Sequence, residues 1–185
     1  MPCFARQQLA AGADGITCAK VSEAEVMAQG GVEDIFIAYP MVGEFRLQRA
    51  LQLQKKLRRL ILAVDSREGA LALNRAAAEA GTVCEVRLEV DTGAKRTGVR
   101  GEQYLELGKQ VGALPNLRLT GIYIFKSLIL HGAPTEDNEA AGQEEGTLMW
   151  EMAQALREAG VPIKEISAGS TPTGLSVAKT GLVTE

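Results

Sequence analysis

The sequence predicts a parallel α/β fold of the (β/α)8 TIM-type barrel, with too few strands to close. Short apolar strands alternate with longer amphipathic segments along all 185 residues, which indicates parallel pairing through right-handed crossovers. The pattern contains about six complete strands and the start of another, whereas a closed barrel needs eight. A doubly wound open sheet is the alternative, but its ligand segments would gather at one switch point, and here they follow several different strands.

The predicted elements succeed one another without an internal repeat. Strands are expected at residues 15–19, 34–40, 60–64, 84–90, 119–125 and 163–167, with another beginning at 182–185. Helices are expected to begin at Ser22, in a Ser-Glu-Ala-Glu capping box, and to cover 44–58, 66–80, 102–111 and 138–159. Ser66 can cap the alanine-rich helix that Gly81 ends.

The composition predicts a cytoplasmic protein with a single domain, which covers residues 1–185. The net charge of −3 argues against a nucleic-acid or anionic-membrane surface, and no apolar run reaches membrane-spanning length. The three cysteines form an odd set without paired spacing, which favours reduced thiols. With one histidine, His131, and no Cys-x-x-Cys, we expect no metal site within this chain.

The run from Glu165 to Thr173 carries the clearest functional signal. An apolar strand breaks into Gly169, Ser170, Thr171 and Thr173, around a proline. The glycine lets the backbone approach a ligand closely, and its neighbours offer hydroxyl and amide donors to a phosphate. The same composition also describes an ordinary turn.

A second segment strengthens the functional interpretation of this loop. It covers residues 89–99, Glu-Val-Asp-Thr-Gly-Ala-Lys-Arg-Thr-Gly-Val. Together the two segments resemble the pyridoxal-phosphate barrel of the alanine racemase N-terminal-domain superfamily, in its D-threonine aldolase/D-serine dehydratase branch. The likeness extends over essentially the whole chain and includes 19–27 and 63–66. It implies pyridoxal 5'-phosphate as cofactor, with its phosphate held by Gly169, Ser170, Thr171 and Thr173.

The same resemblance implies that part of the family's protein is missing. There, the lysine that forms the Schiff base with the cofactor ends the first barrel strand, and the text after it resembles 2–9 of this chain. Val183-Thr184-Glu185 resembles the start of the last barrel strand, before a β-rich C-terminal domain. We therefore expect a barrel without its first strand, most of its last strand and its second domain, and a divalent metal only with that domain.

Four further residues are expected near the cofactor. By resemblance Arg96 contacts the phenolic oxygen of the cofactor ring; the alternative is a surface arginine in a βα loop. Tyr39 and Tyr123 stand at strand ends, where an aromatic side chain lines a pocket or belongs to the core or rim. Ser66 has a role either in the site or as a helix cap.

The remaining candidates are basic. His131 lies in the loop after 122–125 and is expected to be a solvent-exposed loop histidine rather than a residue stacked on the ring. Lys20 and Lys126 each follow an apolar strand and are expected to be solvated loop lysines. Since a Schiff-base lysine must be partly desolvated, the catalytic amine is expected to be absent, with Lys126 the weak candidate.

The function implied is that of a lyase acting on D-amino acids, by retro-aldol cleavage or dehydration of a β-hydroxy substrate, with this chain inactive alone. An amino-acid racemase on the same barrel is one alternative. A non-catalytic product that binds a phosphate-bearing ligand weakly is another. The expected partners are a small amino-acid substrate and, through unpaired strand edges, another copy of the chain.

Overall fold

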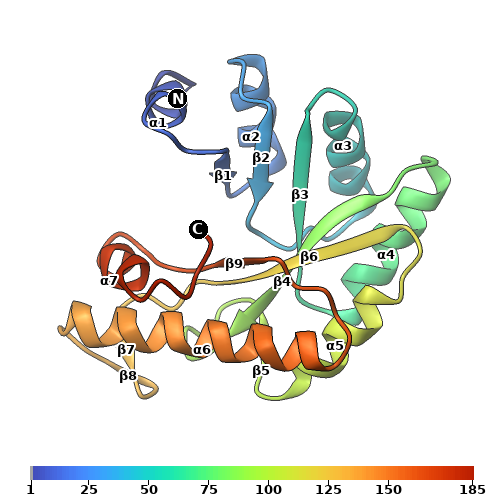
Figure 1. Ribbon diagram of the computed structural model, residues 1–185. Coiled ribbons are helices and arrows are strands. Elements are labelled where there is room, and N and C mark those ends of the chain that lie inside the picture. Colours follow the sequence, from blue (N-terminus) through green and yellow to red (C-terminus); the bar gives the residue numbers. More distant parts are fainter. Residues whose placement is uncertain (1) are drawn as a thin grey trace. The chain divides into compact units, whose positions relative to one another are not determined.

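A computed structural model describes residues 2–185 (Figure 1). The chain divides into two compact units. The first unit contains the chain up to Val64, together with Glu68–Val86 and Pro115–Arg118. The second unit contains Asp65–Arg67, Arg87–Leu114 and Leu119–Glu185. Among the described residues no helix combines the length and the apolar character that crossing a bilayer requires.

The first unit is built on three short parallel strands, β1 (Ile16–Cys18), β2 (Asp34–Ile37) and β3 (Arg59–Val64). Every residue of β2 and all but the first of β3 are buried, as expected for parallel strands covered on both faces. The helices of this part of the chain are α1 (Pro2–Ala10), α2 (Val21–Gln29), α3 (Glu44–Gln54) and α4 (Arg67–Glu79).

The second unit carries the two segments that the sequence singled out. Its strands are β4 (Cys84–Asp91), β5 (Val99–Arg100), β6 (Leu117–Ile124) and β9 (Glu165–Ser167), of which β4 and β6 begin in the first unit. Its helices are α5 (Gln103–Gly112), α6 (Asn138–Glu158) and α7 (Gly174–Lys179), and β7 (Ile129–Leu130) forms a small antiparallel hairpin with β8 (Ala133–Pro134). β6 and β9 pair in parallel, so the segments that follow them leave the same edge.

The strand order β1-β2-β3-β4-β6-β9, with helices in the connections, is that of a (β/α) barrel. Six strands lie on this path within residues 2–185, where a complete barrel has eight. The predicted fold class, an incomplete parallel (β/α) barrel, is confirmed.

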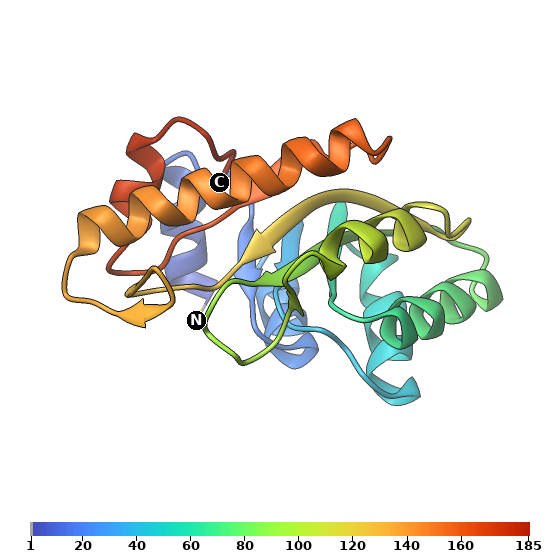
Figure 2. The same ribbon diagram turned by 90° about the horizontal axis from the view of Figure 1, so that it is seen from below.

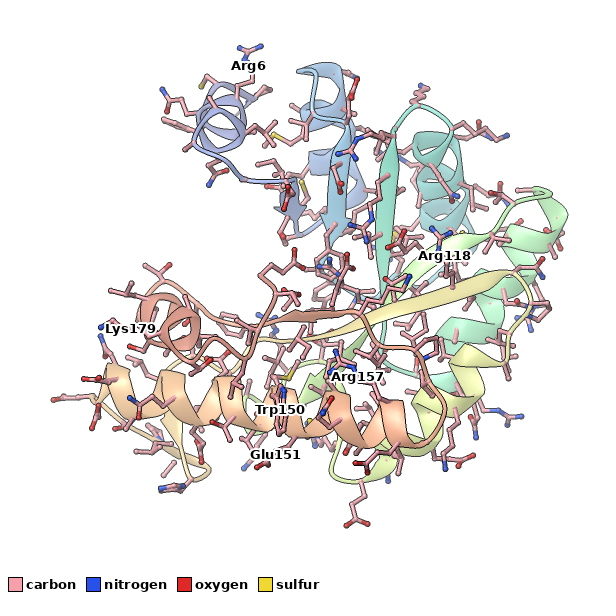
Figure 3. All side chains as sticks on the ribbon, in the orientation of Figure 1. Arg6, Arg118, Trp150, Glu151, Arg157 and Lys179 are labelled. Carbon is pink, nitrogen blue, oxygen red and sulfur yellow. The ribbon has the colours of Figure 1, made fainter. Side chains whose placement is uncertain are left out.

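Within the second unit, α7 lies against the first half of α6 (Figures 1 and 2). Two glycines on α6 allow this contact. A Cβ at Gly142 would lie 2.6 Å from Cβ of Ser176, and one at Gly146 would lie 2.9 Å from Oγ1 of Thr180. Trp150 and Glu151, labelled on α6 in Figure 3, are exposed.

Several predicted details were wrong. Ser22 does not cap α2: the N-cap is Lys20, without a side-chain bond, and the Glu23 carboxylate accepts the Ala19 N–H at 2.7 Å. Residues 182–185 form no strand, although Thr184 N–H donates to the Ile166 carbonyl at 2.9 Å. The structure adds the nine-residue α1 and three shorter features, α7, β5 and the β7–β8 hairpin.

Candidate functional site

The loop after β4 is folded around the side chain of Asp91. Its Oδ1 accepts the N–H groups of Gly93 at 2.9 Å and Lys95 at 3.0 Å, and its Oδ2 accepts Arg100 Nε at 3.0 Å. Burial raises the pKa of Asp91, but the two backbone bonds and Arg100 outweigh it, so the pKa lies below its usual range. Gly98 ends the loop at φ +101, where a Cβ would lie 2.8 Å from the carbonyl carbon of Val90. The turn is therefore fixed by Asp91 and needs glycine at 98.

Arg96 is presented at the surface by this loop. Its guanidinium carbon lies 4.6 Å from the ring centroid of Phe125, which follows β6 and is 42% exposed. The stacking keeps the guanidinium in place without neutralising it. Among residues 2–185 Arg96 makes no ion pair, so its charge is available to an anionic ligand.

Beneath the loop, Glu89 joins β4, the loop and β6 in one buried network. Its Oε2 accepts the Tyr123 hydroxyl at 2.8 Å, and its Oε1 accepts the Thr97 hydroxyl at 2.6 Å. Burial raises the pKa of Glu89, the two hydrogen bonds oppose the rise, and the charge of Asp65 adds to it. Burial and the Glu89 charge also raise the pKa of Tyr123. Tyr123, expected near the cofactor, uses its hydroxyl on Glu89.

The direction of the Glu89 shift sets a pH dependence. Because its folded-state pKa is raised, the folded chain holds a proton that the unfolded chain releases, so Glu89 lowers stability as pH rises from about 4.3 through the raised pKa. Each tenfold difference in proton affinity is worth about 1.4 kcal/mol. We expect Glu89→Gln to gain stability relative to the parent as pH rises above about 4.3, measured by urea unfolding over a series of pH values.

The exposed Glu151→Gln is the matched control and should follow the parent at every pH. A Glu89→Gln curve parallel to the parent's would show that Glu89 does not titrate in this range.

The segment Gly169–Thr173, the anion loop, is closed by its own side chains. The Thr173 hydroxyl accepts Ser170 N–H at 3.1 Å and lies 2.8 Å from Ser170 Oγ. Gly169 has φ +113, and a Cβ there would lie 3.1 Å from Gly174 Cα. Thr173 is fully buried, whereas Thr171 is exposed.

Lys126, at the end of β6, is not the solvated loop lysine that was expected. Its side chain is 1% exposed, and its ammonium pairs with Glu144 of α6. His131 is exposed as expected, with Nδ1 2.9 Å from Glu144 Oε1. Burial raises the pKa of Glu144, but Lys126 and His131 more than reverse that, so its pKa lies below the usual range.

The other predicted residues lie elsewhere. Tyr39 belongs to the first unit and is 48% exposed, beside a cavity of about 650 Å³ also lined by Lys20, Ser22 and Arg46. Ser66 directly precedes α4. Among residues 2–185, no three His, Cys, Asp or Glu side chains group so as to hold a metal ion.

The sequence analysis did not predict a role in the site for four residues of the second unit: Glu89, Thr92, Phe125 and Glu145. A signal existed for Glu89, because β4 is wholly buried and yet carries charged residues at 85, 87, 89 and 91. Thr92 has a buried hydroxyl with no hydrogen-bond partner among the described residues. Glu145 lies in mid-helix, where nothing in the sequence distinguishes it from a solvated carboxylate.

Comparison with known proteins now decides the family. A sequence profile described as "Alanine racemase, N-terminal domain" matches residues 3–183. The chain belongs to this family. The predicted superfamily is thereby confirmed, and the relatives below place the chain in the D-threonine aldolase-like branch.

The most informative relatives of this family member share both sequence and fold. D-threonine aldolase of Arthrobacter sp is 31% identical over 100% of this chain and 48% of that protein. D-threo-3-hydroxyaspartate dehydratase of Delftia sp. (strain HT23) is 35% identical over 98% of this chain and 48% of that protein. The crystal structure of D-threonine aldolase from Filomicrobium marinum superimposes with a TM-score of 0.89 at 28% identity, over 98% of this chain and 49% of that one. The chain thus spans about half the length of each of these three relatives.

Proposed function

We propose that this alanine racemase N-terminal domain binds pyridoxal 5'-phosphate and serves a lyase that acts on β-hydroxy D-amino acids. The relatives named above, an aldolase and a dehydratase of D-amino acids, support the reaction class. The arrangement in the second unit supports the cofactor. Its single most telling feature is the Arg96 guanidinium, which stacks on Phe125, forms no ion pair among residues 2–185, and belongs to a loop that the buried Glu89 network holds in shape.

The residues present fit such a cofactor. An exposed cation suits a ring oxygen or phosphate, the hydroxyl of Thr92 has no hydrogen-bond partner in the described part of the chain, and the anion loop offers the hydroxyls of Ser170 and Thr171. When bound, pyridoxal phosphate supplies an electron-withdrawing ring that stabilises negative charge on the substrate carbon. Within this chain, Arg96 would hold the ring oxygen, and Ser170 and Thr171 would hold the phosphate.

We also propose that Lys126 does not serve as the amine that bonds to the cofactor. A nucleophilic amine must be unprotonated and free to approach the cofactor, and the buried Lys126 is instead paired with Glu144. We therefore propose that this chain alone binds the cofactor without turning over substrate.

The test is a titration of the chain with pyridoxal phosphate, followed by absorbance and by isothermal calorimetry. Saturable binding is expected, weakened about tenfold or more in Arg96→Ala and in the pair Ser170→Ala with Thr171→Ala, because each removes charge-assisted hydrogen bonds worth about 1.5–3 kcal/mol. Arg118→Ala, which removes an exposed arginine of the first unit, should bind as the parent does.

Three outcomes would change the proposal. Parent-like binding by both site variants would remove these residues from the site. A covalent lysine adduct after borohydride, with turnover of D-threonine, would show that a lysine of this chain does the chemistry. Conversion of one enantiomer of alanine into the other, followed by chiral chromatography, would favour a racemase.

A further inference from the structure

Glu145 of α6 is a fully buried carboxylate whose hydrogen bonds come from the anion loop. Its Oε1 accepts Gly169 N–H at 3.1 Å, and its Oε2 accepts the Thr173 hydroxyl at 3.0 Å. A buried carboxylate is tolerated only where donors replace water, and the Gly169 amide and the Thr173 hydroxyl do so here.

The close approach of α6 to the anion loop depends on two glycines, which have no side chain, near Glu145 on the helix. Gly142 lies one turn earlier on the same side of the helix, where a Cβ would lie 2.9 Å from the carbonyl oxygen of Thr173. Gly146 likewise makes room for Thr180. The helix is therefore close enough for a short acidic side chain to reach the loop's amide and hydroxyl.

The bonds made by Glu145 decide which donors of the loop remain for a ligand. Gly169 N–H is taken by the carboxylate, and Ser170 N–H is taken by Thr173 Oγ1. The Thr173 hydroxyl has a single hydrogen, which it donates to Glu145. In the 2.8 Å contact between Ser170 Oγ and Thr173 Oγ1, the donor is therefore the Ser170 hydroxyl. Thr171 has neither its amide nor its hydroxyl engaged within residues 2–185.

We propose that Glu145 is the positioning residue of the anion loop, and that it leaves the Thr171 amide and the Ser170 and Thr171 hydroxyls as the phosphate donors. This rests on the proposed function, since it assigns roles within the same site. The family resemblance implied that Thr173 contacts the phosphate directly. In this proposal Thr173 instead links Glu145 to Ser170. Phosphate would draw the Ser170 hydroxyl away from Thr173, while the bonds of Glu145 stay in place.

The first test follows backbone amides of the chain by ¹H–¹⁵N NMR during titration with inorganic phosphate. The Thr171 amide is expected to shift with saturation, while the Gly169 amide, already bonded to Glu145, shifts far less. In Glu145→Gln the Gly169 amide should move before any phosphate is added, because a carboxylate acceptor has been replaced by a neutral one. A Gly169 amide that responds to phosphate as strongly as Thr171 would overturn the assignment.

The second test compares phosphate affinity among variants that differ in how much of Glu145 they keep. Glu145→Ala should lose at least tenfold, and Glu145→Gln should recover part of that loss, because its carbonyl accepts Gly169 N–H and its amide can donate to Thr173 Oγ1. Glu151→Gln removes an exposed carboxylate from the same helix and should bind as the parent does. Thermal unfolding of each variant separates lost binding from lost folding, and the amide titration of the parent stands even where Glu145→Ala does not fold.

The outcomes distinguish the two proposals. Parent-like phosphate affinity in Glu145→Ala would overturn the role of Glu145 alone. If the parent binds neither phosphate nor pyridoxal phosphate, the proposed function fails, and the anion-loop role fails with it even though the Gly169–Glu145 bond remains visible in the amide shift.

Discussion

Alanine at position 121 is expected to lower the free energy of unfolding by about 3 kcal/mol, at the upper end of the usual cost of overpacking. Gly121 lies in β6 directly opposite Glu165 of β9. A Cβ there would lie 2.5 Å from the Glu165 carbonyl oxygen and 2.9 Å from its Cβ. Since the obstacle is largely backbone, no rotamer change relieves it, and β9 must move. Urea unfolding followed by circular dichroism measures the loss.

Gly112→Ala is the matched control. A Cβ at the end of α5 would find its nearest neighbour, Cγ1 of Val161, at 3.7 Å, which is an ordinary contact. We expect a change within about 1 kcal/mol, with stabilisation the favoured direction, because alanine loses less backbone entropy than glycine. A Gly121→Ala chain as stable as Gly112→Ala would mean that β6 and β9 do not approach as closely as described. Because β9 leads into the anion loop, Gly121→Ala should also weaken phosphate binding.

The alternation of apolar strands with amphipathic segments was enough to predict the fold. The apolar runs at 34–40 and 60–64 became β2 and β3, and the alanine-rich run after Ser66 became α4. Elements with little periodicity were missed. The six residues of α7 and the two-residue strands β5, β7 and β8 are too short to show a repeat, and their positions depend on packing against α6 and β4.

The candidate site was predictable only where backbone chemistry dictates the residue. Glycine at 98 and 169 is required by positive φ and close contacts, and both positions stand in the motifs read from the sequence. Partners brought together from distant segments were not predictable. Lys126 and Glu144 are 18 positions apart, and Tyr123 and Glu89 are 34 apart, so only the folded chain shows that these polar groups serve one another.

Arg87 is another residue whose partners come from distant segments of the chain, and its replacement is expected to cause a second large loss of unfolding free energy. Its side chain is 2% exposed, with Nη2 3.0 Å and Nε 3.3 Å from Oε2 of Glu165, and it also pairs with Glu185. Breaking a buried ion pair costs about 3–5 kcal/mol, but the partner carboxylates are 23% and 47% exposed and regain some hydration. We therefore expect Arg87→Ala to lose about 3 kcal/mol of unfolding free energy.

The control removes an arginine that is itself exposed, and its buried partner Glu85 keeps a second ion pair, with Arg59. Arg118, labelled in Figure 3, lies 2.9 Å from Glu85 with its own side chain 68% exposed, so Arg118→Ala should cost less than about 1 kcal/mol. Arg87→Met separates charge from volume, because methionine fills much of the space without satisfying Glu165. If charge dominates, Arg87→Met should be nearly as destabilised as Arg87→Ala, and adding Glu165→Gln should restore about half the loss. An Arg87→Met chain with parental stability would show that the arginine contributes by packing, and that the carboxylates of Glu165 and Glu185 find sufficient water without it.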